Sequence, residues 1–187
     1  MSQETKVIEK HDVVIRFSGD SGDGMQLTGQ QFSDTAALFG NDVATSPDYP
    51  AAIRAPHGTV GGVSGFQVHI GEEHITTPGD YADVLVAMNP AALKANLRWV
   101  KKAATIILDI DAFTEKHIER AGYTSNPLED GSLADFNLIP VKVSELTVEA
   151  LKETGLDQKS ILRCKNMFAL GMIYWMFEES VEHTEAF

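Results

Sequence analysis

The sequence is poor in the residues that build covalent or metal-centred scaffolds, because Cys164 is its single cysteine. One cysteine excludes an internal disulfide framework, a cysteine-ligated zinc site and an iron–sulfur cluster held by this chain alone. Such low cysteine usage is typical of a reducing compartment. The charged N-terminus MSQETKVIEKHD has no apolar segment resembling a signal peptide. We therefore expect a cytoplasmic protein.

Basic residues and long apolar runs are also scarce. The 15 lysines and arginines face 27 aspartates and glutamates, which gives a formal net charge of -12. No local basic patch stands out in the sequence, although this composition leaves room for one. A field of this sign attracts neither nucleic acid nor an anionic membrane surface. The longest apolar stretch, Met167 to Phe177, is well short of the roughly 20 residues that span a bilayer. We expect partners of neither class.

The chain of 187 residues, 43% of them hydrophobic, is long enough for one domain with a sizeable core. Short β-branched runs alternate with amphipathic helical patterns, which predicts parallel strands joined by crossover helices. We expect strands at 13–17, 42–46, 66–70, 84–88, 105–110 and 136–143, and helices at 25–39, 90–101, 144–154 and 157–177. The expected fold class is α/β, a single Rossmann-like layered domain with a mostly parallel sheet, a β-hairpin excursion and flanking helices.

Local signals refine these elements. The hairpin is expected to form when 74–77 pairs back on 66–70, and the polar stretch 111–135 is expected to be a surface excursion. Ser144 is expected to cap the helix that it opens, and Gly155 to end it. The last helix is apolar around much of its circumference from Met167 onward, so it should be covered by this domain and by a partner.

The stretch FSGDSGDGMQ, residues 17–26, follows the first expected strand and opens a helix. A helix that begins after a glycine loop offers N–H groups and the positive end of its dipole to an anion. The dinucleotide fingerprint fails here, because Leu27 occupies the third glycine position and Asp42 begins the second strand instead of ending it. The nucleotide-hydrolase loop fails because Met25 replaces its lysine. Glycines also form such turns without a ligand, so residue spacing leaves both interpretations open.

Other polar residues could have a role in binding or catalysis or a purely structural one. Arg54 could clamp a phosphate or carboxylate, but an arginine in an irregular loop is more often a surface or interface residue. His57 has no carboxylate or nucleophile at a telling spacing, and His69 and His74 lack further metal ligands. Asn89 could lie beside a ligand at the C-terminal end of a strand, but it is expected to cap the helix that follows it. No residue set supports a self-contained catalytic mechanism.

Four segments occur in a telling order, namely VVIRFSGDSGDGMQLTG, SPDYPAAIRAPHGTVGGVSGFQVHIG, ADVLVAMNPAAL and KNMFALGMIYW. Through them the chain resembles, from about Asp12 to Phe177, the gamma domain of 2-oxoacid:ferredoxin oxidoreductases. It is most similar to the version that opens the alpha subunit of the 2-oxoglutarate enzyme. The resemblance implies an N-terminal tail at 1–11, a gamma-type domain at 12–178 and a C-terminal tail at 179–187 that leads to a thiamine-fold domain.

The resemblance also implies a function. The family oxidatively decarboxylates a 2-oxoacid to an acyl-CoA and reduces ferredoxin. Thiamine diphosphate, magnesium and the iron–sulfur cluster are then expected in partner domains or a beta subunit of a hetero-oligomer, and coenzyme A is a shared substrate. This chain would support coenzyme A binding and complex assembly and would be inactive alone. The alternatives are a purely structural assembly domain and a nicotinamide-dependent dehydrogenase.

The implied cofactor-binding residues lie in the glycine loop and in one later segment. Carried over by position, they are Gly19, Asp20, Ser21, Gly22, Asp23, Gly24, Met25, Gln26 and Arg54. Many gamma subunits have a GGxGGQG-like loop, whereas this chain has GDSGDG, and its two added carboxylates oppose direct contact with a pyrophosphate. Arg54 is followed by Ala-Pro-His instead of glycines, so its role transfers only loosely.

Overall fold

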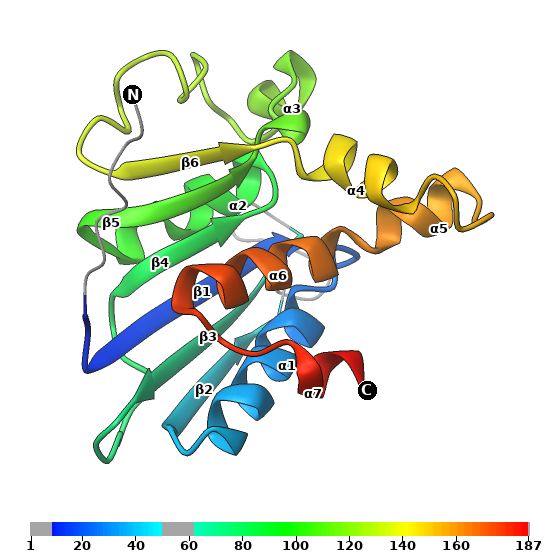
Figure 1. The fold of residues 1–187 in the computed structure, drawn as a ribbon. Coiled ribbons are helices and arrows are strands. Elements are labelled where there is room, and N and C mark those ends of the chain that lie inside the picture. Colours follow the sequence, from blue (N-terminus) through cyan, green and yellow to red (C-terminus); the bar gives the residue numbers. More distant parts are fainter. Residues whose placement is uncertain (1–8, 50–61, 187) are drawn as a thin grey trace, which may run out of the picture.

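The computed structural model describes residues 9–49 and 62–186, which form a six-stranded mixed sheet (Figure 1). The strand order is β2-β3-β1-β4-β5-β6. The strands are β1 (Asp12–Asp20), β2 (Asp42–Asp48), β3 (Val63–Gly71), β4 (Ala82–Ala87), β5 (Val100–Asp109) and β6 (Asn137–Val141). The pairs β1–β4, β4–β5 and β5–β6 are parallel, and β3 runs antiparallel to both β1 and β2. The predicted α/β fold with a mostly parallel sheet is therefore confirmed.

The hairpin is built differently from the prediction. Residues 74–77 form no strand, because both edges of β3 are already paired with β1 and β2. The segment is instead held by the Asp42 carboxylate, whose Oδ2 accepts from the Ile75 N–H at 2.7 Å and lies 2.8 Å from His74 Nδ1. The antiparallel excursion is thus the pair β2–β3.

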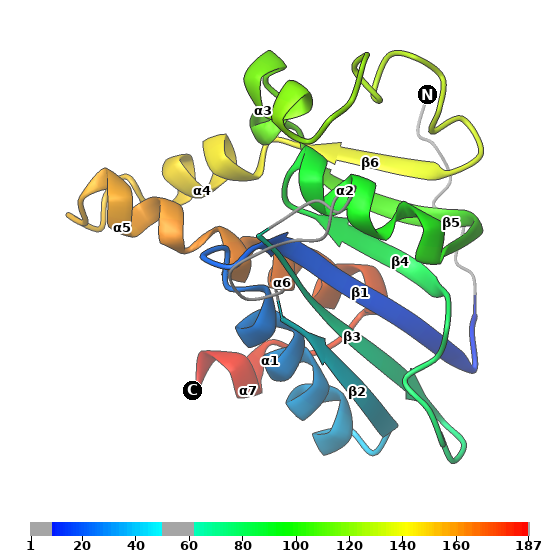
Figure 2. The same cartoon turned by 180° about the vertical axis from the view of Figure 1, so that it is seen from behind.

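Helices cover both faces of the sheet. The α-helices are α1 (Met25–Leu38), α2 (Pro90–Asn96), α3 (Glu115–Arg120), α4 (Val143–Leu151), α5 (Gln158–Arg163), α6 (Lys165–Phe177) and α7 (Glu182–Glu185), with 3-10 turns η1 (Leu97–Trp99) and η2 (Ile110–Ala112). Helices α1 and α6 lie on the face seen in Figure 1, and α2 lies on the opposite face, seen in Figure 2. Within the described ranges, no helix combines the length and the apolarity needed to traverse a bilayer.

Several helix boundaries differ from the sequence prediction. The helix that begins at Pro90 ends earlier because β5 starts at Val100. The stretch expected as one final helix is broken at Cys164, whose φ of -84° and ψ of 2° leave the helical region. Ser144 does not cap α4, since Lys142 holds the cap position and the Ser144 hydroxyl donates to Asp109 Oδ2 at 3.3 Å. The stretch 111–135 contains α3 and buries Ile118 and Leu133.

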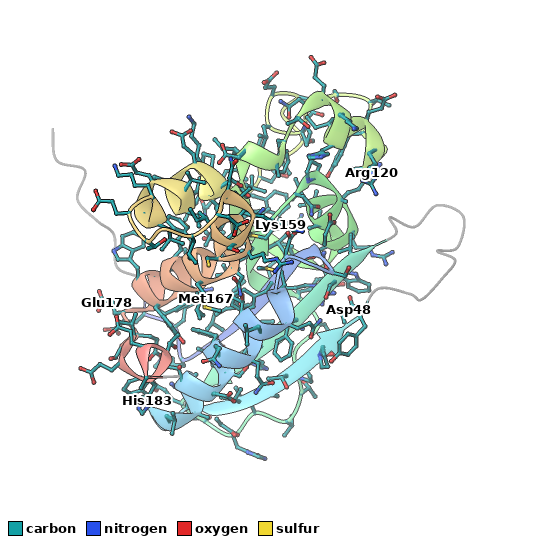
Figure 3. The ribbon with its side chains drawn as sticks, turned by 90° about the vertical axis from the view of Figure 1, so that its right-hand side faces the viewer. Asp48, Arg120, Lys159, Met167, Glu178 and His183 are labelled. Atoms are coloured by element: carbon teal, nitrogen blue, oxygen red, sulfur yellow. The ribbon has the colours of Figure 1, made fainter. Side chains whose placement is uncertain are left out.

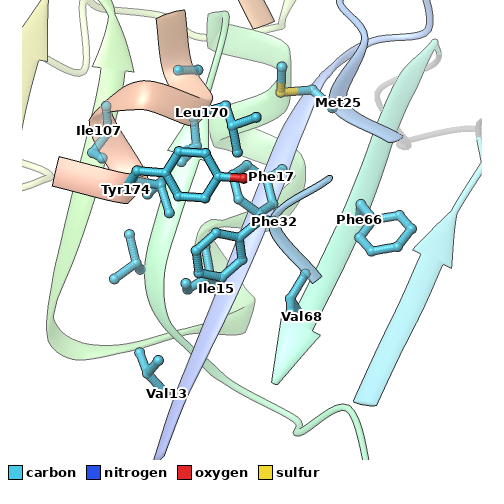
Figure 4. Packing of buried hydrophobic residues seen from close by; sticks show 14 of the residues in the cluster. Val13, Ile15, Phe17, Met25, Phe32, Phe66, Val68, Ile107, Leu170 and Tyr174 are labelled. Carbon is cyan, nitrogen blue, oxygen red and sulfur yellow. The ribbon is translucent and has the colours of Figure 1, made fainter. Parts of the chain in front are cut away.

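The larger core cluster lies between the sheet and the helices α1 and α6 (Figure 4). The Phe32 ring lies 6.1 Å from that of Phe17 on β1 and 6.0 Å from that of Tyr174 on α6. Full burial of each such side chain stabilises the fold by about 1.5–3 kcal/mol. Met25, Phe32 and Ala36 confirm the predicted apolar stripe, whereas Phe39 is 49% exposed. This packing holds the starts of α1 and α6 next to each other.

Candidate functional site

The glycine loop connects the carboxyl end of β1 to α1, at the edge of the sheet where the parallel strands end. Figure 1 shows α4 and α5 projecting from this same edge. In open α/β sheets, ligands bind in the crevice outside the carboxyl ends of the strands. The predicted loop therefore stands at the position that the fold favours for a ligand.

The loop glycines have distinct roles. Gly24 has a φ of +73° and precedes α1 without any side-chain cap, and a Cβ there would lie 2.8 Å from Asn166 Nδ2 on α6. A Cβ on Gly19 would lie 2.7 Å from Asp23 Oδ2. By contrast, a Cβ on Gly22 would meet nothing within 4 Å. Two glycines are thus required by close packing, while Gly22 leaves the backbone open to an incoming group.

The two loop carboxylates are engaged within the protein. Asp20 Oδ1 accepts from Asn89 Nδ2 at 3.0 Å, and Asp23 Oδ2 accepts from the Asp20 N–H at 2.8 Å. The other oxygen of Asp23 lies 4.0 Å from Lys165 Nζ. Burial raises the pKa of the Asp23 carboxyl, although the Asp20 N–H and the Lys165 charge act in the opposite direction. The loop carboxylates therefore oppose a bound anion less than the bare sequence suggests.

Lys165 also faces a second, more deeply buried carboxylate. Its Nζ lies 3.6 Å from Oδ2 of Asp109, the last residue of β5. Asp109 Oδ1 is buried and has no hydrogen-bond partner among the described residues. Burial raises the pKa of Asp109, and the positive charge of Lys165 lowers it in part. One ammonium group thus stands between the glycine loop and the end of the third parallel strand.

A pocket of about 540 Å³ opens beside the loop, between it and the helices α5 and α6. Its lining residues, which we call the basic pocket, are Gly22, Asp23, Gln158, Lys159, Leu162, Arg163 and Lys165. Lys159 and Arg163 are exposed, and neither forms an ion pair within residues 9–49 and 62–186. Figure 3 looks onto this edge of the molecule and shows Lys159 beside the β1–α1 loop. The site therefore presents net positive charge in an acidic protein.

The charge changes sign across α5. A second pocket of similar size, also about 540 Å³, shares Gln158 and Leu162 with the basic pocket but is lined by Asp111, Glu145 and Glu149. Like charges repel an anion on that side. An anionic ligand is therefore favoured only on the side of the glycine loop.

Sequence reasoning missed the basic pocket. Lys159, Arg163 and Lys165 lie within seven residues of a chain that has 15 lysines and arginines in total, so the local density was a usable signal. Their proximity to Gly22 could not be seen, because it depends on how α5 returns to the loop at the carboxyl edge. The local basic patch that the composition left possible is therefore this pocket.

Two predicted site residues have structural roles in this fold. Met25 is buried in the core. The Gln26 amide donates to Gly65 O at 2.6 Å, Ser64 Oγ at 3.0 Å and Asp48 O at 3.1 Å, so it ties α1 to β2 and β3. Neither side chain lines the basic pocket. Arg54 and His57 lie outside the described residues.

The remaining candidates have local partners. Asn89 caps α2, as predicted, since its Oδ1 accepts from the Ala92 N–H at 2.8 Å. His69 lies 2.7 Å from Thr77 O through Nδ1 and 3.1 Å from Asp12 Oδ2 through Nε2. In the part of the chain that the structure describes, no group of three or more His, Cys, Asp or Glu side chains is placed to hold a metal ion. The chemistry that this site offers is anion binding.

Known proteins are similar to this chain in sequence and fold. Residues 14–186 match the family model described as pyruvate ferredoxin/flavodoxin oxidoreductase. The chain is 53% identical over 176 residues to the 2-oxoglutarate oxidoreductase subunit KorA of Mycobacterium tuberculosis, which covers 94% of this chain and 27% of that protein. The chain thus spans about a quarter of the length of this curated relative.

Two solved structures are similar as well. The 2-oxoglutarate:ferredoxin oxidoreductase of Magnetococcus marinus, solved with 2-oxoglutarate, coenzyme A and succinyl-CoA bound, is 27% identical with a TM-score of 0.65. The match covers 89% of this chain and 24% of that one. The gamma subunit of a keto/oxoacid ferredoxin oxidoreductase from Geobacter sulfurreducens is 18% identical with a TM-score of 0.59, over 87% of this chain and 75% of that one. This second likeness shows the shared fold.

Proposed function

Because the chain belongs to the pyruvate ferredoxin/flavodoxin oxidoreductase family as its gamma-type domain, we propose that it is part of a 2-oxoglutarate:ferredoxin oxidoreductase. The 53% identity with a 2-oxoglutarate oxidoreductase subunit supports this substrate. The assembled enzyme would decarboxylate 2-oxoglutarate oxidatively, form succinyl-CoA and reduce ferredoxin. The chain spans 27% of that relative, so we assign this activity to the assembly and not to the chain alone.

We propose that this domain contributes to binding coenzyme A. The observation that carries the proposal is the juxtaposition of the open backbone at Gly22 with the basic pocket. Coenzyme A carries several phosphate charges, which suit a glycine loop at a helix N-terminus and nearby cations. The presence of coenzyme A in the related Magnetococcus marinus structure supports this ligand. In this role the chain binds and orients a substrate, and partner domains supply the reacting groups.

Thiamine diphosphate, magnesium and the iron–sulfur cluster belong to partner domains or subunits in this proposal. A cluster requires several thiolate ligands, and Cys164 is the single cysteine of the chain. Its thiol is half-buried and donates to Ser160 O at 3.5 Å. The electron-transfer chemistry that ends on ferredoxin therefore takes place outside this domain.

Assembly is the second part of the proposed role. Helix α6 exposes Met167, Gly171 and Trp175 at a spacing of four residues, and the Trp175 side chain is 75% exposed. Residues four apart lie on one face of a helix, so they form an apolar stripe (Figure 3, Met167). Since the two 2-oxoglutarate enzymes that match are more than three times as long as this chain, we propose that their additional domains cover this stripe. Large exposed aromatic side chains are typical of such interfaces.

The experiment that tests the coenzyme A role uses the complete enzyme, with this chain assembled with its partner domains. Gly22→Asp adds a carboxylate at the mouth of the basic pocket, whereas Gly22→Ala adds a methyl group alone. We expect the aspartate to raise the KM for coenzyme A by about tenfold and to leave the KM for 2-oxoglutarate unchanged, with the alanine variant close to wild type. Unchanged coenzyme A kinetics in an intact complex would instead establish a purely structural assembly role.

A further inference from the structure

The basic pocket contains more positive charge than its own carboxylate can neutralise. Lys159, Arg163 and Lys165 line the pocket with one carboxylate, that of Asp23. The Asp109 carboxylate, which faces Lys165, still leaves three cations against two anions. The nearest carboxylate oxygens lie 3.6 Å and 4.0 Å from Lys165 Nζ, whereas a direct charge-assisted hydrogen bond is about 2.7–2.9 Å long. Within the described ranges Lys159 and Arg163 form no ion pair at all. Their donors are therefore available to a ligand.

The arrangement of Lys159 and Arg163 indicates which kind of anion would bind in the pocket. Lys159 and Arg163 are four residues apart on α5, so they lie on the same face of that helix, and both line the pocket. An arginine fork with an adjacent ammonium group suits a compact anion that carries several free oxygens. A phosphate monoester meets this description and carries about −1.5 to −2 charge at neutral pH. A phosphate within a diester or pyrophosphate bridge has fewer ionisable oxygens and carries less charge.

The surroundings restrict where such a group can sit. On the far side of α5, the second pocket is lined by Glu145 and Glu149, whose negative charges repel a phosphate group. On the near side, a Cβ added to Gly22 would have no neighbouring atom within 4 Å. The loop backbone is therefore open at this point and can contact the rest of a ligand. The space for a monoester therefore lies against α5, and the space for the remainder of a ligand lies along the glycine loop.

We propose that Lys159 and Arg163 form the binding site for a phosphate monoester, and that this group is the 3′-phosphate of coenzyme A. The 3′-phosphate is the single monoester of that molecule, and its other two phosphates are bridged. Lys165 lines the same pocket, where its ammonium group lies between Asp23 and Asp109. The inference rests on the proposed function and adds to it the residues that distinguish coenzyme A from 3′-dephospho-coenzyme A.

The test compares the two thiols as substrates of the complete enzyme. In Lys159→Gln and Arg163→Gln we expect the KM for coenzyme A to rise by about tenfold, and the KM for 3′-dephospho-coenzyme A to stay within about twofold of wild type. Lys116→Gln and Arg120→Gln are matched controls, because these residues hold the same second and last positions of α3, another six-residue helix. Both controls should behave as wild type with either thiol.

Inhibitors identify the source of the phosphate. Adenosine 3′,5′-bisphosphate should compete with coenzyme A in wild type and lose about tenfold of its potency in Arg163→Gln, whereas stronger competition by inorganic phosphate or adenosine diphosphate would reject the 3′-phosphate. Equal KM changes for both thiols, or no change for either, would overturn the inference while leaving the proposed function intact. A wild-type enzyme whose turnover does not depend on coenzyme A would overturn the proposed function itself.

Discussion

Lys165 Nζ lies 3.6 Å from Oδ2 of Asp109, a carboxylate whose side chain is 0% exposed. The ammonium group belongs to the start of α6 and the carboxylate to the end of β5, so the contact joins two elements that are distant in the chain. The same ammonium group lies 4.0 Å from Asp23 in the glycine loop. A single cation therefore couples the core of the sheet to the candidate ligand site.

Removal of this cation should destabilise the fold. Lys165→Met leaves Asp109 buried without a counter-charge, and the loss of one partner of a buried ion pair costs about 3–5 kcal/mol. We expect the urea midpoint to fall accordingly at neutral pH. The double variant Lys165→Met/Asp109→Asn removes both charges and should recover most of the loss. A double variant as unstable as the single one would show that Lys165 acts through packing of its side chain.

The raised pKa of Asp109 predicts a pH dependence of stability. Because burial holds the folded pKa above the ordinary value of 3.8, the folded state retains a proton that the unfolded state has already lost. The free energy of unfolding contributed by this group is therefore full below 3.8 and falls as the pH rises to the raised pKa. Asp109→Asn should flatten this part of the curve, measured by urea titrations at successive pH values. Parallel curves for both proteins would contradict the assignment.

Gly24 should tolerate no side chain. Gly24→Ala places a Cβ at a φ of +73° and 2.8 Å from Asn166 Nδ2. The left-handed conformation alone costs about 1–2 kcal/mol for an alanine, so we expect thermal unfolding at a clearly lower temperature. Gly22→Ala is the control, since nothing lies within 4 Å of its Cβ position. Equal melting temperatures for the two variants would mean that the loop relaxes away from α6.

Replacement of glycine by alanine should destabilise the protein on α1 and stabilise it on α6. A Cβ at Gly29 on α1 would lie 2.2 Å from Phe66 Cδ1 on β3, and overpacking of this kind costs about 1–3 kcal/mol or more. Gly171 on α6 has nothing within 4 Å, so Gly171→Ala should stabilise by about 0.5–1 kcal/mol through helix propensity. Differential scanning calorimetry of both variants measures the difference. A stable Gly29→Ala protein would disprove the close approach of α1 to β3.

Sequence patterns were reliable where the deciding contacts are local. The strand–loop–helix start was predicted from a β-branched run, a glycine cluster and an apolar stripe, and β1 and α1 confirm it. The Asn89 cap was predicted from the place of this residue before Pro90, and the contact with Ala92 that confirms it spans only three residues. The family also followed from the order of short motifs along the chain.

Predictions failed where contacts with an element distant in the sequence determine the local structure. Residues 74–77 carry strand-like character, but β2 occupies the edge of β3 on which they would pair. Ser144 suits a helix cap, yet its hydroxyl donates to Asp109 at the end of β5. The final helix was expected to be continuous, but the chain turns at Cys164, between α5 beside the glycine loop and α6 on the sheet. In each case propensity was overridden by contacts with another part of the chain.

The sequence by itself determined the fold class, the position of the glycine loop and the family, because periodicity and motif order are properties of neighbouring residues. Tertiary structure alone decided which charges meet. It brought Lys159, Arg163 and Lys165 to Gly22 and turned Asp23 toward Lys165. The reason is that electrostatic energy depends on distance in space, and the return of α5 and α6 to the carboxyl edge of the sheet sets those distances.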